Sequence, residues 1–165
     1  MTPLIVLVGP PGAGKSTVGG LLAERRGVAF RDTDRDVEAT AGVSISDLFV
    51  DRGEPAFREL EREAVRAAVD QHDGVLALGG GAILDASTRQ LLEDQTVVFL
   101  DVGLSDAASR VGFNRDRPLL LGNPRAQLRT MLEERRPLYL EVATISISTD
   151  GKTPEQVADE IDAAL

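Results

Sequence analysis

Five short apolar runs, set apart by longer stretches with helical spacing, organise the sequence. We predict strands at 4–8, 28–30, 75–78, 97–100 and 145–147. In the longest stretch between two runs, Phe57, Leu60, Ala64 and Ala68 recur at the three- and four-residue spacing of one helix face. Strands that alternate with helices predict an α/β domain with a five-stranded, mainly parallel sheet.

Local capping signals mark the ends of the predicted helices. Gly27 follows the first helical stretch, in the position where a glycine commonly ends a helix. Asn123 followed by Pro124 combines an N-cap residue with a proline at the first helical position. Further helix starts are predicted at Ser44, Asp85, Ser105 and Thr153.

Composition suits one domain and excludes several kinds of site. A chain of 165 residues with 42% hydrophobic side chains is typical of a single domain, spanning 1–165, with a packed core. The absence of cysteine excludes disulfides and thiolate chemistry, and a single histidine excludes a multi-histidine metal site. We expect that histidine, His72, to be exposed, because it stands in a polar stretch at a helix end.

The charge and the length of the apolar runs bear on partners and location. A net charge of −9 argues against nucleic acid and anionic membranes as partners, because both attract basic surfaces. No apolar run approaches the ~20 residues of a membrane-spanning helix. We therefore expect a cytoplasmic protein. Only two of the 18 basic residues are lysines, Lys15 and Lys152, so a lysine at a special position is informative.

The strongest motif lies at 9–17, where the sequence reads Gly-Pro-Pro-Gly-Ala-Gly-Lys-Ser-Thr. It fits the phosphate-loop pattern G-x-x-x-x-G-K-[ST], and it stands between a predicted strand and a predicted helix, as that motif requires. Backbone N–H groups of such a loop and of the helix start surround phosphate oxygens. The expected nucleotide-binding residues are Gly12, Ala13, Gly14, Lys15, Ser16 and Thr17. The motif predicts that the chain binds a nucleoside triphosphate, with Lys15 on the β- and γ-phosphates and the Ser16 hydroxyl on Mg²⁺.

A pair of carboxylates follows the second predicted strand. Asp32 and Asp34 stand two residues apart, so in an extended chain they point the same way, near the ligand crevice of an open α/β sheet. One could help to hold Mg²⁺ through water while the other accepts a hydrogen bond from an acceptor hydroxyl. Helix capping by Thr33, Asp34 and Asp36 explains the same residues equally well.

Two further groups have both a functional and a structural interpretation. Arg58 and Glu61 in Phe57-Arg58-x-x-Glu61 lie three residues apart, which favours either an ordinary surface ion pair or an arginine offered to an anionic substrate and oriented by Glu61. Gly79, Gly80 and Gly81 follow the third strand. They suit a tight turn, or a backbone that approaches a ligand closely.

Two more motifs complete the set: Arg117-Pro118-Leu119-Leu120, and Glu134-Arg135-Arg136-Pro137-Leu138-Tyr139. Together with the motifs above, their order and spacing resemble those of the shikimate kinase family over essentially the whole chain. The resemblance implies a P-loop NTPase fold of the nucleoside monophosphate kinase type, a three-layer sandwich. It also implies transfer of the γ-phosphoryl of ATP to the 3-hydroxyl of shikimate, with Mg²⁺ as cofactor.

On the acceptor side, the resemblance assigns catalytic contact with the shikimate hydroxyls to Asp34. Arg58, supported by Glu61, would hold the carboxylate of shikimate together with Arg135, and the backbone of Gly79–Gly81 would approach the ring. The substrate-binding region would span about 33–61.

The choice of the second carboxylate-binding arginine depends on how the motif is aligned with the family pattern. Neighbouring residues on a helix point about 100° apart, so only one of Arg135 and Arg136 faces a pocket. The match to the family pattern Glu-Arg-x-Pro-Leu-Tyr selects Arg135.

On the nucleotide side, Lys15 would be catalytic and Ser16 would bind Mg²⁺ directly, with Asp32 behind a coordinated water. Arg110 and Pro154 resemble the pair that sandwiches adenine. Arg117 would belong to a lid over the phosphates, at about 112–124, with a catalytic and nucleotide-binding role. A lid that closes only when both ligands are bound suppresses transfer to water.

Two other functions remain open from the sequence. Gluconate is also a hydroxylated acid, so a gluconate kinase of similar size would use similar arginines. A nucleotide-binding regulatory protein without turnover is a different class, and Asp34, Arg58, Arg117 and Arg135 argue against it, because a switch needs no acceptor site. We expect a monomer whose partners are shikimate and ATP.

Overall fold

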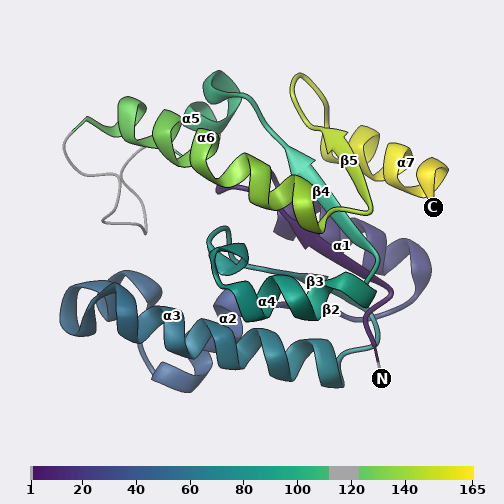
Figure 1. Cartoon of the computed structure of the whole chain (residues 1–165). Coiled ribbons are helices and arrows are strands. Elements are labelled where there is room, and N and C mark those ends of the chain that lie inside the picture. The colour runs from purple at the N-terminus through teal and green to yellow at the C-terminus, as the bar shows by residue number, and fades with distance from the viewer. Residues whose placement is uncertain (1, 112–122) are drawn as a thin grey trace.

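The computed structural model describes residues 2–111 and 123–165 and joins the five predicted strands in one parallel sheet (Figure 1). The strands are β1 (Ile5–Val8), β2 (Phe30–Asp32), β3 (Val75–Ala77), β4 (Val97–Asp101) and β5 (Ile145–Ser148). Their order is β2-β3-β1-β4-β5, and each neighbouring pair is parallel. The predicted five-stranded α/β fold is therefore confirmed.

Helices cover both faces of the sheet and make the three layers (Figure 1). They are α1 (Lys15–Arg26), α2 (Thr33–Ala41), α3 (Ile45–Gln71), α4 (Ala86–Leu91), α5 (Leu104–Val111), α6 (Pro124–Val142) and α7 (Pro154–Ala164), with short 3₁₀ turns η1 (Ala82–Leu84) and η2 (Leu92–Asp94). Because side chains alternate along a strand, Ile5 and Leu7 of β1 enter one core while Val6 and Val8 enter the other.

The predicted helix ends agree with the structure, because capping depends on a few neighbouring residues. Gly27 ends α1 with a left-handed φ of 65°. The side chains of Ser44, Asp85 and Asn123 accept hydrogen bonds from the backbone N–H three residues ahead. Thr153 opens α7 with a complete capping box. One start differs, since α5 begins at Leu104 and not at Ser105.

The second strand was predicted two residues too early. The N–H of Val28 bonds the carbonyl of Ala23, so this residue still belongs to the end of α1. Pairing with β3 begins only at Phe30, which lies opposite Val75. Asp32 is consequently the last residue of β2, and α2 begins at the next residue.

The prediction that His72 is exposed was wrong. The residue is the C-cap of α3 and is buried, and its Nε2 lies 3.0 Å from the carbonyl oxygen of Val75. The chain turns back into β3 at this point, so the strand covers a side chain that the polar local sequence suggested was exposed.

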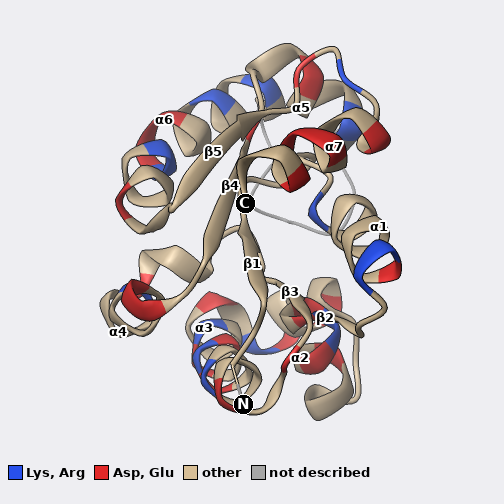
Figure 2. Ribbon diagram, turned by 90° about the vertical axis from the view of Figure 1, so that its right-hand side faces the viewer, with Lys and Arg blue, Asp and Glu red and all other residues tan. Residues whose placement is uncertain are grey.

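Figure 2 shows basic residues on α1 and acidic residues on α7, and ion pairs join these two helices. The last turn of α1 and the acidic face of α7 are joined by Arg25–Asp159 at 2.9 Å and Arg26–Asp162 at 2.8 Å. Across residues 2–111 and 123–165, the structure contains no helix with the length and apolar character needed to cross a membrane.

Candidate active site

Three of the predicted motifs lie at one edge of the sheet. The phosphate loop follows β1, Asp32 ends β2, and the three glycines follow β3. Because β1, β3 and β2 are parallel neighbours, their carboxyl ends lie side by side. This is the edge at which open α/β sheets bind ligands.

The phosphate loop has the geometry that its glycines allow. Gly12 and Gly14 take left-handed φ values of 83° and 89°, and Gly14 leads directly into α1. Gly9 lies so close to β4 that an added Cβ would stand 2.6 Å from the carbonyl oxygen of Leu100. The Lys15 ammonium donates to the carbonyls of Gly9, at 2.7 Å, and Pro10, at 3.0 Å, which holds it against the loop.

Asp32 serves the helix and the loop at once. Its Oδ1 accepts a hydrogen bond from Asp34 N–H at 2.9 Å and caps α2, while its Oδ2 accepts from the Ser16 hydroxyl at 2.9 Å. The extended arrangement expected for Asp32 and Asp34 is therefore wrong, since Asp34 stands in the first turn of α2. The oxygens of Ser16 and Asp32 are hard ligands of the kind that Mg²⁺ prefers. Two such protein groups suit a site in which phosphates and water supply most of the Mg²⁺ ligands.

Asp34 nevertheless reaches the loop. A cavity of about 260 Å³ is lined by Lys15, Ser16, Asp32, Asp34 and Gly80, together with other loop residues. The cavity joins the predicted phosphate-binding groups to the carboxylate predicted to meet the acceptor hydroxyl. Of the predicted acceptor-side residues, Asp34 and Gly80 line this cavity, and Arg58 and Arg135 do not.

Arg58 is fixed by two carboxylates on α3. Its Nη1 donates to Glu61 at 2.7 Å and its Nε to Glu54 at 3.2 Å. Glu61 is buried, with only 3% of its surface exposed, and Arg58 is mostly covered and lies over the Phe57 ring. A pair this buried is not an ordinary surface ion pair, and its geometry agrees with an arginine oriented by Glu61.

The two neighbouring arginines of α6 point in different directions. Arg135 is buried, and burial lowers the pKa of its guanidinium, with repulsion from Arg58 adding to the effect and Tyr139 and Glu61 opposing it. Arg136 is half-exposed and donates to Asp101 at 2.9 Å, a hydrogen bond that raises its pKa. Arg135 is the residue that joins the Arg58–Glu61 pair.

Each of the three glycines has a close neighbour that an added Cβ would crowd. A Cβ on Gly79 would stand 2.5 Å from Asp34 Oδ1 and 2.8 Å from Glu61 Oε2. A Cβ on Gly80 would stand 3.0 Å from the Pro11 ring, and one on Gly81 would overlap the Arg58 guanidinium. The turn therefore packs directly against the candidate site residues, which favours the close-approach interpretation over a simple turn.

Substitution of Gly81 is expected to disturb the site without disturbing the fold. In Gly81→Ala the added methyl group displaces the Arg58 guanidinium, so the KM for the acidic substrate is expected to rise roughly tenfold, a loss of one charge-assisted contact. Gly20→Ala is the matched control, because a Cβ there has open space. Steady-state kinetics on both variants test this, and an unchanged KM in Gly81→Ala contradicts the packing role.

Arg110 and Pro154 line a second cavity, of about 310 Å³, beside the phosphate loop. Arg110 donates to the carbonyl of Gly12 at 3.0 Å and to Thr149, which ties α5 to the loop. Lys152 lines the same cavity and pairs with Glu160 at 2.6 Å. The predicted adenine pair is therefore brought together next to the predicted phosphate site.

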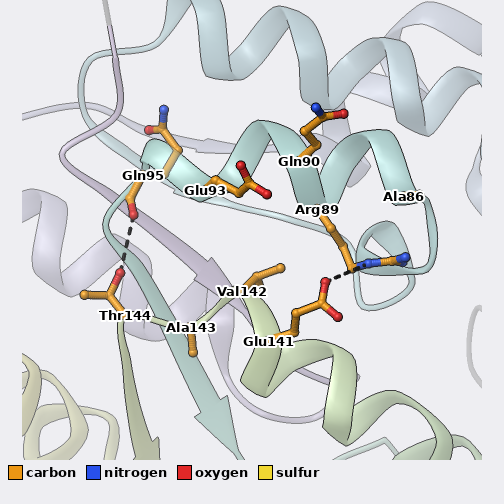
Figure 3. A pocket seen from close by; sticks show the side chains of 9 residues that line it. All are labelled: Ala86, Arg89, Gln90, Glu93, Gln95, Glu141, Val142, Ala143 and Thr144. Carbon is orange, nitrogen blue, oxygen red and sulfur yellow. Dashed lines mark hydrogen bonds and ion pairs between the residues drawn. The ribbon is translucent and has the colours of Figure 1, made fainter.

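A larger cavity, of about 440 Å³, lies at the opposite edge of the sheet, before β4 and β5 (Figure 3). Part of its polar lining is paired, since Arg89 donates to Glu141 at 3.1 Å and Thr144 donates to the Gln95 carbonyl at 3.3 Å. None of the residues lining it belongs to a predicted site. Arg117 and most of the predicted lid lie outside the described residues.

Tyr139 is a site neighbour that sequence reasoning missed. Its hydroxyl donates to the Gly80 carbonyl at 2.6 Å, and burial raises the pKa of the phenol to about 12. Because the pKa of Tyr139 is higher in the folded than in the unfolded chain, its neutral phenol contributes stability that is fully present below the ordinary value near 10. This contribution is lost as pH rises from there to about 12.

The expected result is a stability that falls with pH in this window by up to roughly 1.4 kcal/mol per pH unit, from this group alone. Tyr139→Phe is expected to be less stable at neutral pH and to have a flatter profile above pH 10. Urea unfolding of both proteins measures the difference, and parallel profiles contradict it.

A phosphate loop that shares a cavity with Asp34, together with the mostly covered Arg58 and the buried Arg135, defines a class: the fold and site are those of a P-loop kinase that acts on a small molecule. Comparison with known proteins identifies the family. The shikimate kinase family profile matches residues 11–165. The chain belongs to the shikimate kinase family.

Individual relatives agree over the full length. The chain is 59% identical to a shikimate kinase from Salinispora arenicola, over 100% of this chain and 99% of that protein. It is 60% identical to one from Streptomyces coelicolor, over 94% and 91%. Among solved structures, a shikimate kinase from Acinetobacter baumannii in complex with shikimate matches with a TM-score of 0.94 and 38% identity, over 99% of this chain and 93% of that one.

Proposed function

We propose that this protein transfers the γ-phosphoryl of ATP to the 3-hydroxyl of shikimate, giving shikimate 3-phosphate and ADP. The observation that carries the proposal is one cavity lined by Lys15, Ser16 and Asp34, together with Arg58 packed against Gly81 of the glycine turn and the buried Arg135. Family membership supports the substrate pair. A gluconate kinase is disfavoured because the family is that of shikimate kinases.

The nucleotide side positions phosphates and neutralises their charge. Lys15 contacts the β- and γ-phosphates, and backbone N–H groups of the loop surround them. The Ser16 and Asp32 oxygens are the groups that would hold Mg²⁺, Ser16 directly and Asp32 through water. When bound, Mg²⁺ supplies positive charge to the phosphate oxygens. Arg110 and Pro154 enclose the adenine.

The acceptor side orients the hydroxyl. Asp34 accepts a hydrogen bond from the 3-hydroxyl and turns its oxygen toward the γ-phosphate. A loose transition state for phosphoryl transfer needs little deprotonation of the acceptor, so orientation carries most of the effect of Asp34. Arg58 and Arg135 bind the carboxylate, for which the planar guanidinium is suited.

Local positive charge makes the site possible in an acidic protein. Two anions must meet in a chain of net charge −9. Arg58 and Arg135 are two mostly covered cations beside one buried carboxylate, Glu61, so positive charge remains, and at short range its field is stronger than that of exposed acidic groups in water.

The remaining assignments extend the same proposal. The chain forms one kinase domain over 1–165, with substrate binding at about 33–61 and a lid at about 112–124 that carries Arg117. We also propose that the enzyme acts as a monomer in the cytoplasm, where ATP is supplied.

A coupled assay tests the reaction directly. ADP release is expected with ATP, Mg²⁺ and shikimate together and not when shikimate is replaced by gluconate, and the phosphate is expected on the 3-oxygen by ³¹P NMR. ADP release without an acceptor, or equal rates with gluconate, contradicts the proposal.

Arg58→Ala is expected to weaken shikimate binding far more than ATP binding. Removing one partner from a buried charged contact corresponds to roughly a hundredfold rise in the KM for shikimate. The KM for ATP is expected to change less than about threefold, because Arg58 lies on α3, away from the nucleotide cavity. Steady-state kinetics with each substrate varied in turn give the comparison, and equal effects on both contradict the role of Arg58.

A further inference from the structure

The glycine turn after β3 is held by two buried hydroxyl groups from distant parts of the chain. Gly79 N–H donates to Thr33 Oγ1 at 3.2 Å. The carbonyl of Gly80 accepts from the Tyr139 hydroxyl at 2.6 Å. The carbonyls of Gly79 and Gly81 are used by the continuing chain in η1. The position of the turn relative to α2 and α6 is thus set by these two side chains.

Thr33 ties the turn to the two carboxylates. It is completely buried and stands between Asp32 and Asp34 at the start of α2. Its short side chain bonds Gly79, and an added Cβ on that glycine would meet Asp34 Oδ1. The Thr33 hydroxyl therefore fixes the separation between the turn and Asp34.

Tyr139 ties the turn to the buried arginine. It stands four residues after Arg135 on α6, which places both on one helix face. The ring is buried and stacks on Phe99 with centroids 5.0 Å apart, so its hydroxyl has little freedom to move. The Tyr139 hydroxyl therefore fixes the separation between the turn and Arg135.

A turn of three glycines needs such support. Glycine has the greatest conformational freedom of any residue, and a Cβ on any of the three would crowd Asp34, Pro11 or Arg58. Backbone hydrogen bonds to rigid elements are the remaining means of holding the turn in one conformation before the substrate arrives, and such preorganisation lowers the entropic cost of binding.

We propose that Thr33 and Tyr139 are positioning residues for the acceptor site: their hydroxyls hold the Gly79–Gly81 turn at the distance from Asp34 and Arg135 that shikimate binding requires. This inference rests on the proposed function. Neither residue needs to touch the substrate, since each acts through the backbone of the turn.

The test compares two substitutions at Thr33 with a matched threonine elsewhere. Thr33→Val keeps the shape and removes the hydroxyl, which leaves the buried Gly79 N–H without its acceptor, and Thr33→Ser keeps the hydroxyl. Thr88→Val is the control, because Thr88 is also buried, its side chain helps to lower the pKa of the Asp85 carboxyl at the start of α4, and it lines neither cavity of the predicted site. KM for shikimate, KM for ATP and the melting temperature are measured for each protein.

We expect Thr33→Val to raise the KM for shikimate about tenfold, with the KM for ATP within about twofold, and Thr33→Ser to restore near-normal values. Thr88→Val is expected to lower the melting temperature without changing either KM. Tyr139→Phe is expected to resemble Thr33→Val, and it decides the question alone if Thr33→Val does not fold.

Three results overturn the proposal: an unchanged KM for shikimate in Thr33→Val, equal changes in both KM values, or the same change in Thr88→Val. If Thr33→Val does not fold, an unchanged KM for shikimate in Tyr139→Phe overturns it. Failure of the function itself gives a different result, because the unsubstituted protein then lacks activity with shikimate.

Discussion

Lys15→Ala is expected to lower kcat by at least about a thousandfold, the scale on which a single cation contributes to phosphoryl transfer. In the folded protein the ammonium bonds the carbonyls of Gly9 and Pro10, so it stands over the loop that surrounds the phosphates. Lys15→Ala removes a positive charge beside the phosphates, where negative charge is redistributed during phosphoryl transfer. Folding is expected to change little, since the loop geometry rests on glycine conformations and on the start of α1.

The measurement is a single-turnover rate with saturating ATP and shikimate, together with the melting temperature. Arg66→Ala is the control, because it removes a positive charge from an exposed position on α3. Near-normal turnover in Lys15→Ala means that the loop at 9–17 does not hold the transferred phosphate.

Arg135→Ala and Arg136→Ala are expected to differ sharply although the residues are neighbours. Arg135 is buried beside Arg58, Glu61 and Tyr139, so its loss is expected to raise the KM for shikimate roughly a hundredfold or more. Arg136 forms a half-exposed pair with Asp101, and such pairs contribute only about 1 kcal/mol or less. Its loss is expected to change the KM for shikimate less than about threefold.

Steady-state kinetics with shikimate varied at fixed ATP test the pair. Arg136→Ala is the internal control, because it removes the same side chain one position along α6. If Arg136→Ala has the larger effect, the assignment of the motif on α6 shifts by one residue. Equal small effects exclude both arginines from the acceptor site.

Features encoded by adjacent residues were predictable from the sequence. The phosphate loop, the N-caps at Ser44 and Asn123 and the glycine end of α1 depend on a few neighbours, and the structure contains each of them. The three-glycine turn was predictable as a place of close approach, because three consecutive glycines cost conformational entropy and need a steric reason at the end of a strand. Its partners were not.

Features that depend on tertiary contacts could not be predicted from the sequence. His72 is buried because β3 turns back over it, and no local pattern records that event. The roles of Thr33 and Tyr139 require knowing that α2, α6 and the turn meet, and a threonine inside Asp-Thr-Asp looks like a spacer between two carboxylates. The capping alternative was assigned to Thr33, Asp34 and Asp36, whereas the cap of α2 is Asp32, one of whose carboxylate oxygens caps the helix while the other accepts from Ser16.

The most direct test of the acceptor geometry is a crystal structure with Mg²⁺, a non-hydrolysable ATP analogue and shikimate. Our assignment predicts the 3-hydroxyl within hydrogen-bond reach of Asp34, at roughly 2.6–3.2 Å, and facing the terminal phosphate. It also predicts the shikimate carboxylate between Arg58 and Arg135. A carboxylate bound away from these arginines, or an Asp34 side chain directed away from the hydroxyl, contradicts it.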